Sequence, residues 1–342
     1  MSTPEMRIGL EIETLLIQRD VNAKQLSLEA FAKLAVKSYN AKIDTDKYLK
    51  MHPDIDGAWE GDEYKDWSLT DDATIAGATK TNNKYAVEFV SPILRYDSTG
   101  LWRAHVQNLF KTMRESYVFE SNRSCGFHVH ASPAAGAWSL QELKSICMAV
   151  VYFEDAFEAI VPEHRRGNQW IKSNTVDNPK LANLPTAQIF ERIKACENAV
   201  EIADLMHPDR YYAWNFTNLY YGGKATIEWR RAAGVTSAEG CLVWAELAID
   251  FLQSARRPGV QLGKYSRDVA GLRAFVGEGL VAGMSDERYL RPIFEGKSGS
   301  LKPLKLKEKD EDLLKKKEKQ DKKKNLMMKK LRQDLARNPP LK

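Results

Sequence analysis

The segment RIGLEIETLL, residues 7–16, alternates apolar and polar side chains with a period of two. Successive side chains of a β-strand point to opposite faces, so this pattern predicts a half-buried strand. The same alternation recurs in three further segments: KYAVEFV at 84–90, GFHVHA at 126–131 and KATIEWR at 224–230. Four such strands predict a sheet with one apolar face and one polar face.

Longer segments with helical periodicity lie between these strands. The clearest are residues 101–116, 139–161, 187–206 and 237–256. The second begins with Ser139 and has Glu142 three positions later, which is the spacing of a capping box. The strands are spaced irregularly between the helices, and this favours an α+β fold with a mainly antiparallel sheet over a doubly wound one.

Charge divides the 342-residue chain into a body and a tail. Residues 297–342 hold 17 Lys and Arg against 7 Asp and Glu, whereas the whole chain has a net charge of only +5. We therefore predict one catalytic domain over 1–295 and a basic tail over 296–342 that is flexible or partly helical. The tail could bind nucleic acid only non-specifically, through its charge.

The body has the composition of an intracellular globular protein. No apolar run approaches the roughly 18 residues of a membrane span, and the sequence begins without the order of a secretion signal. The four cysteines are widely spaced, with no Cys-x-x-Cys pair. These features predict a cytoplasmic protein that does not contact membranes. The sequence does not determine an oligomeric state.

Metal-competent side chains share the polar face of the predicted sheet. Residues at i and i+2 of a strand lie on the same side. This rule groups Glu11 with Glu13, His128 with His130, and Glu228 with Arg230, and it adds Glu88 from residues 84–90. Each pair alone is typical of a solvated sheet face or of a surface ion pair.

Together, the four carboxylates predict a cation site, because like charges on one face repel one another. Carboxylate oxygens with one or two imidazoles suit Mg²⁺ or Mn²⁺ rather than structural zinc. Such ions usually hold substrate phosphates, and arginines can bind phosphate oxygens through two hydrogen bonds. The candidates for this role are Arg165, Arg166, Arg210, Arg230 and Arg231.

An ordered set of motifs resembles the amidoligase family, which is related to glutamine synthetase and glutamate–cysteine ligase. The motifs are GLEIE, WSLTDDATI, EFVSPIL, GFHVH, RRGN, YYAWNF and TIEWRRAAG, and they run from about residue 7 to residue 235. Ala73 departs from the pattern, because the family more often has glycine there. The resemblance does not extend to the tail.

This resemblance implies a glutamine-synthetase-like domain, with a curved sheet that holds metal ions on its concave face and helices on its convex face. It implies that Glu13 and Glu88 bind one metal ion, and that Glu11, His128 and Glu228 bind another. It also implies that Arg230 steadies the transferred phosphate and that Asp72 lies near the substrate. His130 is a candidate for phosphate contact or support of the site, and Asn215 a candidate for the pocket lining.

The expected activity is ATP- and Mg²⁺-dependent ligation of a small-molecule or peptide carboxylate to an amine through an acyl phosphate. Two alternatives stay open at this point. One is a phosphotransferase similar to the guanidino kinases, and the other is a non-catalytic nucleotide-binding module that docks partners through its basic tail.

Overall fold

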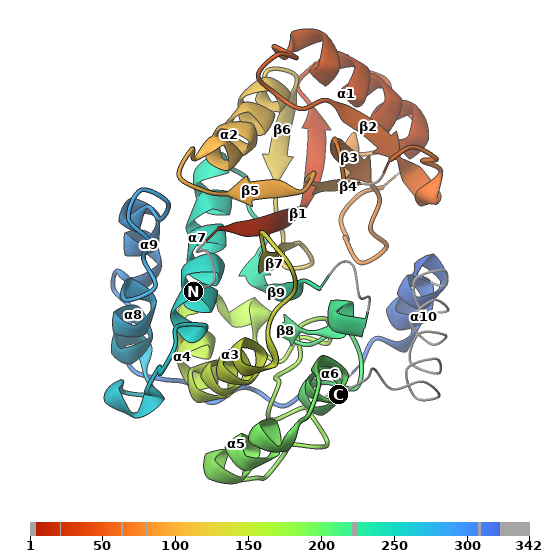
Figure 1. Ribbon diagram of the computed structural model, residues 1–342. Coiled ribbons are helices and arrows are strands. Elements are labelled where there is room, and N and C mark those ends of the chain that lie inside the picture. The colour runs from red at the N-terminus through yellow and green to blue at the C-terminus, as the bar shows by residue number, and fades with distance from the viewer. Residues whose placement is uncertain are drawn as a thin grey trace.

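A nine-stranded sheet forms the centre of the computed structural model (Figure 1). The structure describes residues 5–20, 22–62, 64–79, 81–220, 225–306 and 309–321. Seven strands follow one another in the order β2-β3-β4-β1-β7-β9-β8, and β5 and β6 pair with β1. The strands are β1 Met6–Gln18, β2 Met51–Asp54, β3 Trp67–Thr70, β4 Lys84–Val90, β5 Leu94–Tyr96, β6 Tyr117–Glu120, β7 Gly126–Pro133, β8 Trp214–Asn215 and β9 Ile227–Ala233.

The pairing is antiparallel throughout the sheet except between β2 and β3. All four strands predicted from alternation are present as β1, β4, β7 and β9, although the expected start of β9 at Lys224 lies outside the described residues. The predicted α+β class with a mainly antiparallel sheet is therefore confirmed.

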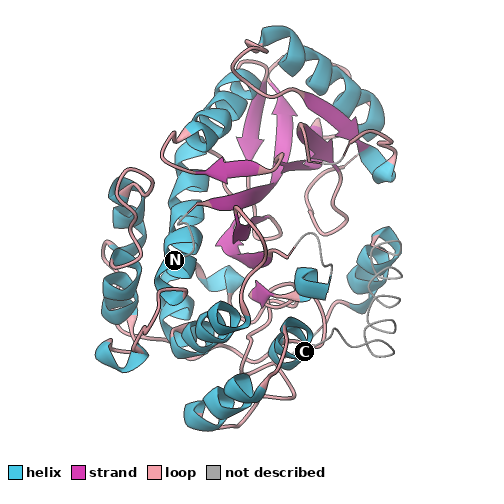
Figure 2. Ribbon diagram, in the orientation of Figure 1, coloured by secondary structure: helices cyan, strands magenta, loops and turns pink. Residues whose placement is uncertain are grey.

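Helices lie around this sheet (Figure 2). In the described part of the chain they are α1 Leu28–Lys42, α2 Leu101–Arg114, α3 Leu140–Tyr152, α4 Glu154–Ile160, α5 Thr186–Ala195, α6 Ala199–Met206, α7 Ala238–Ala255, α8 Val269–Gly277, α9 Glu287–Phe294 and α10 Glu311–Gln320. Short 3₁₀ turns occupy Ile55–Gly57, Glu163–Arg165, Thr217–Tyr220 and Leu262–Lys264.

Two of the predicted helices are divided in the structure. The segment 139–161 begins with the expected capping box of Ser139 and Glu142, but it separates into α3 and α4 at Phe153, whose ψ of 11° leaves the helical range. The segment 187–206 separates into α5 and α6, because Cys196 is extended and the Asn198 side chain caps α6 by accepting from Glu201 N.

The alternation seen in the sequence decides which face of the sheet is buried. Leu10, Ile12, Val129 and Trp229 are each at most 1% exposed, and they belong to the main core together with residues of α1, α2 and α7. Burial of such side chains contributes about 1.5–3 kcal/mol each. The opposite face, which carries the carboxylates, is thereby left available for chemistry.

The described part of the tail packs against the body rather than projecting from it. Leu301 N donates to Asp155 O at 3.0 Å, and Leu306 N donates to Asp177 Oδ1 at 2.9 Å. The chain then reaches α10 (Figure 1), and residues 322–342 fall outside the described range. The domain boundary at 295/296 stays a prediction.

None of the helices built from described residues is long and apolar enough to cross a lipid bilayer.

Candidate functional site

Strand register brings the predicted metal-binding residues together across consecutive strands. Glu13 of β1 lies opposite Glu88 of β4, and Glu11 of β1 lies opposite His128 of β7. His130 of β7 in turn lies opposite Glu228 of β9. The four strands are neighbours in the sheet, so residues far apart in the chain form one polar patch.

Within this patch, two groups of side chains have the ligand number and spacing of metal sites. Glu11, His128 and Glu228 offer ligand atoms that all lie within 4.8 Å of one another, and so do Glu13, Glu88 and His128. Opposite ligands of an Mg²⁺ ion lie about 4.2 Å apart, since each bond is about 2.1 Å long. In either group, the ligand atoms would therefore need to move only slightly closer together to bind an ion.

His128 lies between the two groups. Its Nδ1 is 2.8 Å from Glu11 Oε2 and 3.7 Å from Glu228 Oε1, and its Nε2 is 3.6 Å from Glu13 Oε1. The family resemblance places this imidazole with Glu11 and Glu228, whereas the structure also brings it within reach of Glu13. A neutral imidazole offers one free nitrogen, so it can ligate only one ion at a time.

Burial makes the negative charge of this patch costly. Glu13 and Glu228 are 5% and 1% exposed. Burial, together with the charges of Glu11, Asp72 and Glu13, raises the pKa of Glu88 well above its usual range. Burial would also raise the pKa of Glu228, but Arg230 and His130 lower it to about 2. Glu228 thus has a guanidinium partner, whereas Glu88 is surrounded by like charges. Carboxylates crowded in this way fit a cation site.

Arg230 and Arg231, which are adjacent in the chain, have different partners. β7 and β9 change register between the pairs Phe127–Ala232 and Val129–Trp229, so Arg230 and Arg231 together face His128 as a β-bulge. Arg230 Nη1 donates to Glu228 Oε1, and Arg230 lines a small cavity that also includes Glu13 and His128.

Arg231 does not reach this cavity. Its Nη1 lies 2.8 Å from Glu158 Oε2, on α4, and both side chains are at most 2% exposed. The structure therefore places Arg231, predicted to contact phosphate, in a buried ion pair away from the carboxylates.

The two arginines of the RRGN motif also have different positions. Arg165 is 3% exposed, donates from Nη2 to Arg230 O at 2.9 Å and lines the cavity. Arg166 does not line it, and its buried Nε has no hydrogen-bond partner among the described residues. Of the two arginines, Arg165 is the one that lines the cavity.

The remaining residues predicted to contact the cofactor are Asn215, His130 and Arg210. Asn215 Nδ2 donates to Glu228 Oε2 at 2.6 Å, and His130 Nε2 lies 3.1 Å from Glu11 Oε1. Arg210 pairs with Asp321 of the tail at 3.2 Å. These contacts make Asn215 and His130 positioning residues for the two carboxylates.

Asp72, which the family resemblance places near the substrate, lines the cavity, and its surroundings are unexpected. Oδ1 accepts from Thr74 N at 2.7 Å and from Thr74 Oγ1 at 2.6 Å. Oδ2 lies 2.5 Å from Lys317 Nζ, which comes from α10 of the tail. Burial would raise the pKa of Asp72, but Lys317 and Thr74 lower it.

Several residues at the site are missed by sequence reasoning. Gly126 is one, because a Cβ there would lie 3.0 Å from both Arg165 Nη2 and His128 Nε2. Its place at the start of GFHVHA is the only signal in the sequence. Trp170 and Ser124 line the cavity from loops, and no pattern marks them.

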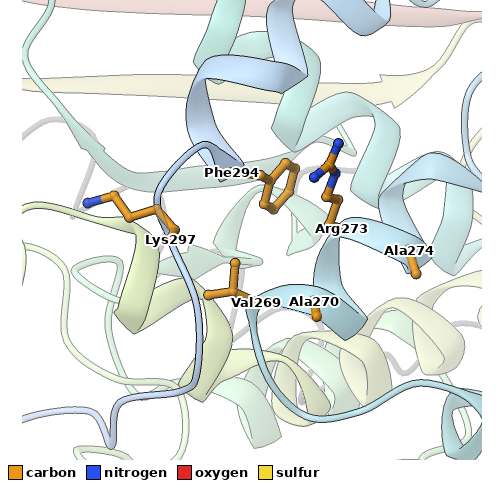
Figure 3. Close-up of a pocket in the computed structure, with 6 residues that line it drawn as sticks. All are labelled: Val269, Ala270, Arg273, Ala274, Phe294 and Lys297. Carbon is orange, nitrogen blue, oxygen red and sulfur yellow. The ribbon is translucent and has the colours of Figure 1, made fainter.

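A second hollow lies on the surface along α8 and α9 and has a volume of about 400 Å³ (Figure 3). Its lining includes Phe294, Arg273 and Lys297, and it shares no residue with the carboxylate cavity. Apolar groups with two cations offer no ligand for a metal ion, so this hollow is not a candidate metal site.

The chain matches the family described as "putative amidoligase enzyme" over residues 4–252. It therefore belongs to this family, and the resemblance noted in the sequence is confirmed. Membership indicates a ligase activity, and the matched region contains every strand of the carboxylate patch. A search of curated proteins finds no match.

Proposed function

We propose that the protein is an ATP-dependent carboxylate–amine ligase that uses Mg²⁺ or Mn²⁺. A carboxylate oxygen of the first substrate attacks the γ-phosphorus of ATP, the bond to the bridging oxygen breaks, and ADP leaves. The nitrogen of an amine then attacks the acyl carbon, inorganic phosphate leaves, and the nitrogen loses a proton. The product is an amide.

One observation carries this proposal: two ligand groups on consecutive strands lie beside the guanidinium of Arg230. Phosphoryl transfer needs positioning and stabilisation of negative charge more than covalent chemistry from the protein. Bound divalent ions would supply the positive charge that the transferring phosphoryl group requires.

We assign each residue a role from its position in the site. Glu13 and Glu88 would hold one ion, and Glu11 and Glu228 another, with His128 available to either group. Arg230 and Arg165 would contact phosphate oxygens through guanidinium groups that stay charged. Asp72 would face the substrates at the edge of the cavity.

We extend the proposal to fold kinship and location. The carboxylate face would correspond to the metal-bearing concave face of a glutamine-synthetase-like sheet, and the helices that join the main core, among them α1, α2 and α7, to its convex covering. Four free, buried cysteines suit a reducing cytoplasm. The substrates are a small-molecule or peptide carboxylate and an amine.

The test is a panel of carboxylates incubated with ATP, Mg²⁺ and hydroxylamine, which captures an acyl phosphate as a hydroxamate. We expect one class of carboxylate to give hydroxamate and ADP in equal amounts. Arg230→Lys should slow this reaction by about 10²–10³-fold, the usual effect of losing one donor to a developing charge. Arg288→Lys, a change at an exposed arginine on α9, is the matched control.

Two other results would replace the proposal. ADP release with a phosphorylated nitrogen in the product would indicate a guanidino-kinase-like enzyme. Metal-dependent ATP binding without turnover across the panel would favour a binding module.

A further inference from the structure

The C-terminal segment places a lysine side chain inside the candidate active site. Lys317 of α10 lines the same cavity as Glu13, His128 and Arg230, and its side chain is only 12% exposed. Its ammonium group lies 2.5 Å from Asp72 Oδ2. A chain segment well beyond the family-matched region, which ends at residue 252, thus reaches the reacting face.

Gln320 and Asp321 hold this segment at the site through further contacts. Gln320 Nε2 donates to Asp71 O at 3.0 Å, and Gln320 Oε1 accepts from Ala73 N at 3.1 Å. The next residue, Asp321, is 3% exposed and pairs with Arg210 at 3.2 Å. The loop around Asp72 and the rim arginine therefore both contact the tail.

The docking of α10 is polar. None of its ten residues is fully buried, and the contacts described above are ion pairs and hydrogen bonds. Lys317 and Asp72 are largely buried, so their ion pair is costly to break without a replacement, but a ligand with its own ammonium group could take the place of Lys317 beside Asp72. The docking of α10 is thus of a kind that a competing amine can replace.

We propose that Asp72 marks the amine end of the site and that residues 309–321 are a tethered occupant of it, with Lys317 in the place of the acceptor amine. This inference rests on the proposed ligase function. A lysine side chain is a primary amine on an unbranched alkyl chain, so the acceptor substrate belongs to that class. It would displace Lys317 and pair with Asp72 before it gives up a proton and attacks the acyl carbon.

The docking is tested by hydrogen exchange of the full-length protein, followed at the amides of α10. Lys317→Gln should accelerate exchange there by about fivefold or more, since one partly buried ion pair is lost. Lys316→Gln removes the same charge from an exposed position of the same helix and should leave the rate unchanged. Exchange in β1 reports whether the body stays folded in both variants.

The amine class is tested by adding n-butylamine or N-acetyl-lysine amide to the wild-type protein. Either compound should accelerate α10 exchange with saturation, whereas tetramethylammonium at equal ionic strength should not. Equal exchange in the Lys317→Gln and Lys316→Gln variants would overturn the tethered occupant. Acceleration by tetramethylammonium as well would overturn the amine assignment.

These measurements need neither ATP nor turnover, so they stand apart from the test of the ligase reaction. If the reaction is demonstrated, Lys317→Gln should lower the KM for the amine and leave the KM for ATP unchanged. A merely structural role of Lys317 would not separate these two constants.

Discussion

Glu13 of β1 and Glu88 of β4 lie directly opposite each other in the antiparallel register, so two carboxylates share one cross-strand position. Like charges at such a position destabilise a sheet. Burial and three neighbouring carboxylates raise the pKa of Glu88, and the opposing effect of Lys317 is too small to reverse this shift. The pairing is thus costly unless a cation lies between the two groups, and it gives a direct way to detect metal binding.

Replacing Glu88 with Gln should raise the melting temperature of the metal-free protein and remove the stabilisation that Mg²⁺ gives to the wild type. The amide keeps the shape of the side chain but removes one of the facing charges. A ligand present at about 100 times its Kd adds about 2.7 kcal/mol to the free energy of unfolding, so the loss is measurable by calorimetry. Glu60→Gln, at an exposed position, is the control. Equal Mg²⁺ stabilisation in both variants would exclude Glu88 as a ligand.

Gly126 tests how closely the ligands are packed. A methyl group at this position would lie 3.0 Å from His128 Nε2 and 3.3 Å from Glu13 Oε2. Gly126→Ala should therefore weaken Mg²⁺ affinity about tenfold or more while costing about 1–3 kcal/mol of stability through overpacking. Gly9→Ala is the matched control, because its new methyl group would meet His130 Cβ at an ordinary 3.5 Å. Isothermal titration with Mg²⁺ measures both, and unchanged affinity in Gly126→Ala would show that the ion binds elsewhere.

Alternation in the sequence is sufficient to predict which residues share a face, because the backbone of a strand points successive side chains to opposite sides. Glu11 and Glu13 were grouped in this way, and so were His128 and His130. The pairing of Glu13 with Glu88 could not be predicted in the same way, since register depends on turns and on long-range contacts. The structure supplies that register.

Other features depend on structure that leaves no periodic signal. The bulge that directs Arg231 to Glu158 changes the register by one residue within a strand that otherwise alternates regularly. The sequence also gives no sign that Lys317 docks at the site, because a lysine-rich helix with little apolar surface is typical of a solvated segment. Only the position of α10 beside Asp72 distinguishes this lysine from its neighbours.

Asp250 of α7 should make stability depend on pH. It is fully buried beside Glu246, and its Oδ1 accepts from Ser285 Oγ at 2.6 Å and from Tyr96 Oη at 3.2 Å. Arg103 pairs with Glu246 rather than with Asp250. Burial raises the pKa of Asp250 to about 7.

The direction of this effect follows from the protons bound by each state. Between about pH 4 and about pH 7 the unfolded chain loses the Asp250 proton while the folded protein keeps it, so this group makes the folded state less stable as pH rises. Asp250→Asn should reduce the fall in the free energy of unfolding by on the order of 3 kcal/mol, and Glu246, whose pKa burial raises to about 8, should leave a smaller fall of the same sign. Denaturant unfolding at about pH 5 and at about pH 7 measures the fall. The exposed change Asp46→Asn is the control, and a slope as steep in Asp250→Asn as in the wild type would assign the effect to other groups.

If the carboxylate patch binds ATP through divalent ions, titration calorimetry will detect the dependence on metal. We expect ATP to bind in the presence of Mg²⁺ or Mn²⁺ and to show no measurable binding in excess chelator. Glu13→Gln, which replaces a ligand oxygen, should lose the metal-dependent binding. Equal ATP affinity with metal and with chelator would contradict this expectation.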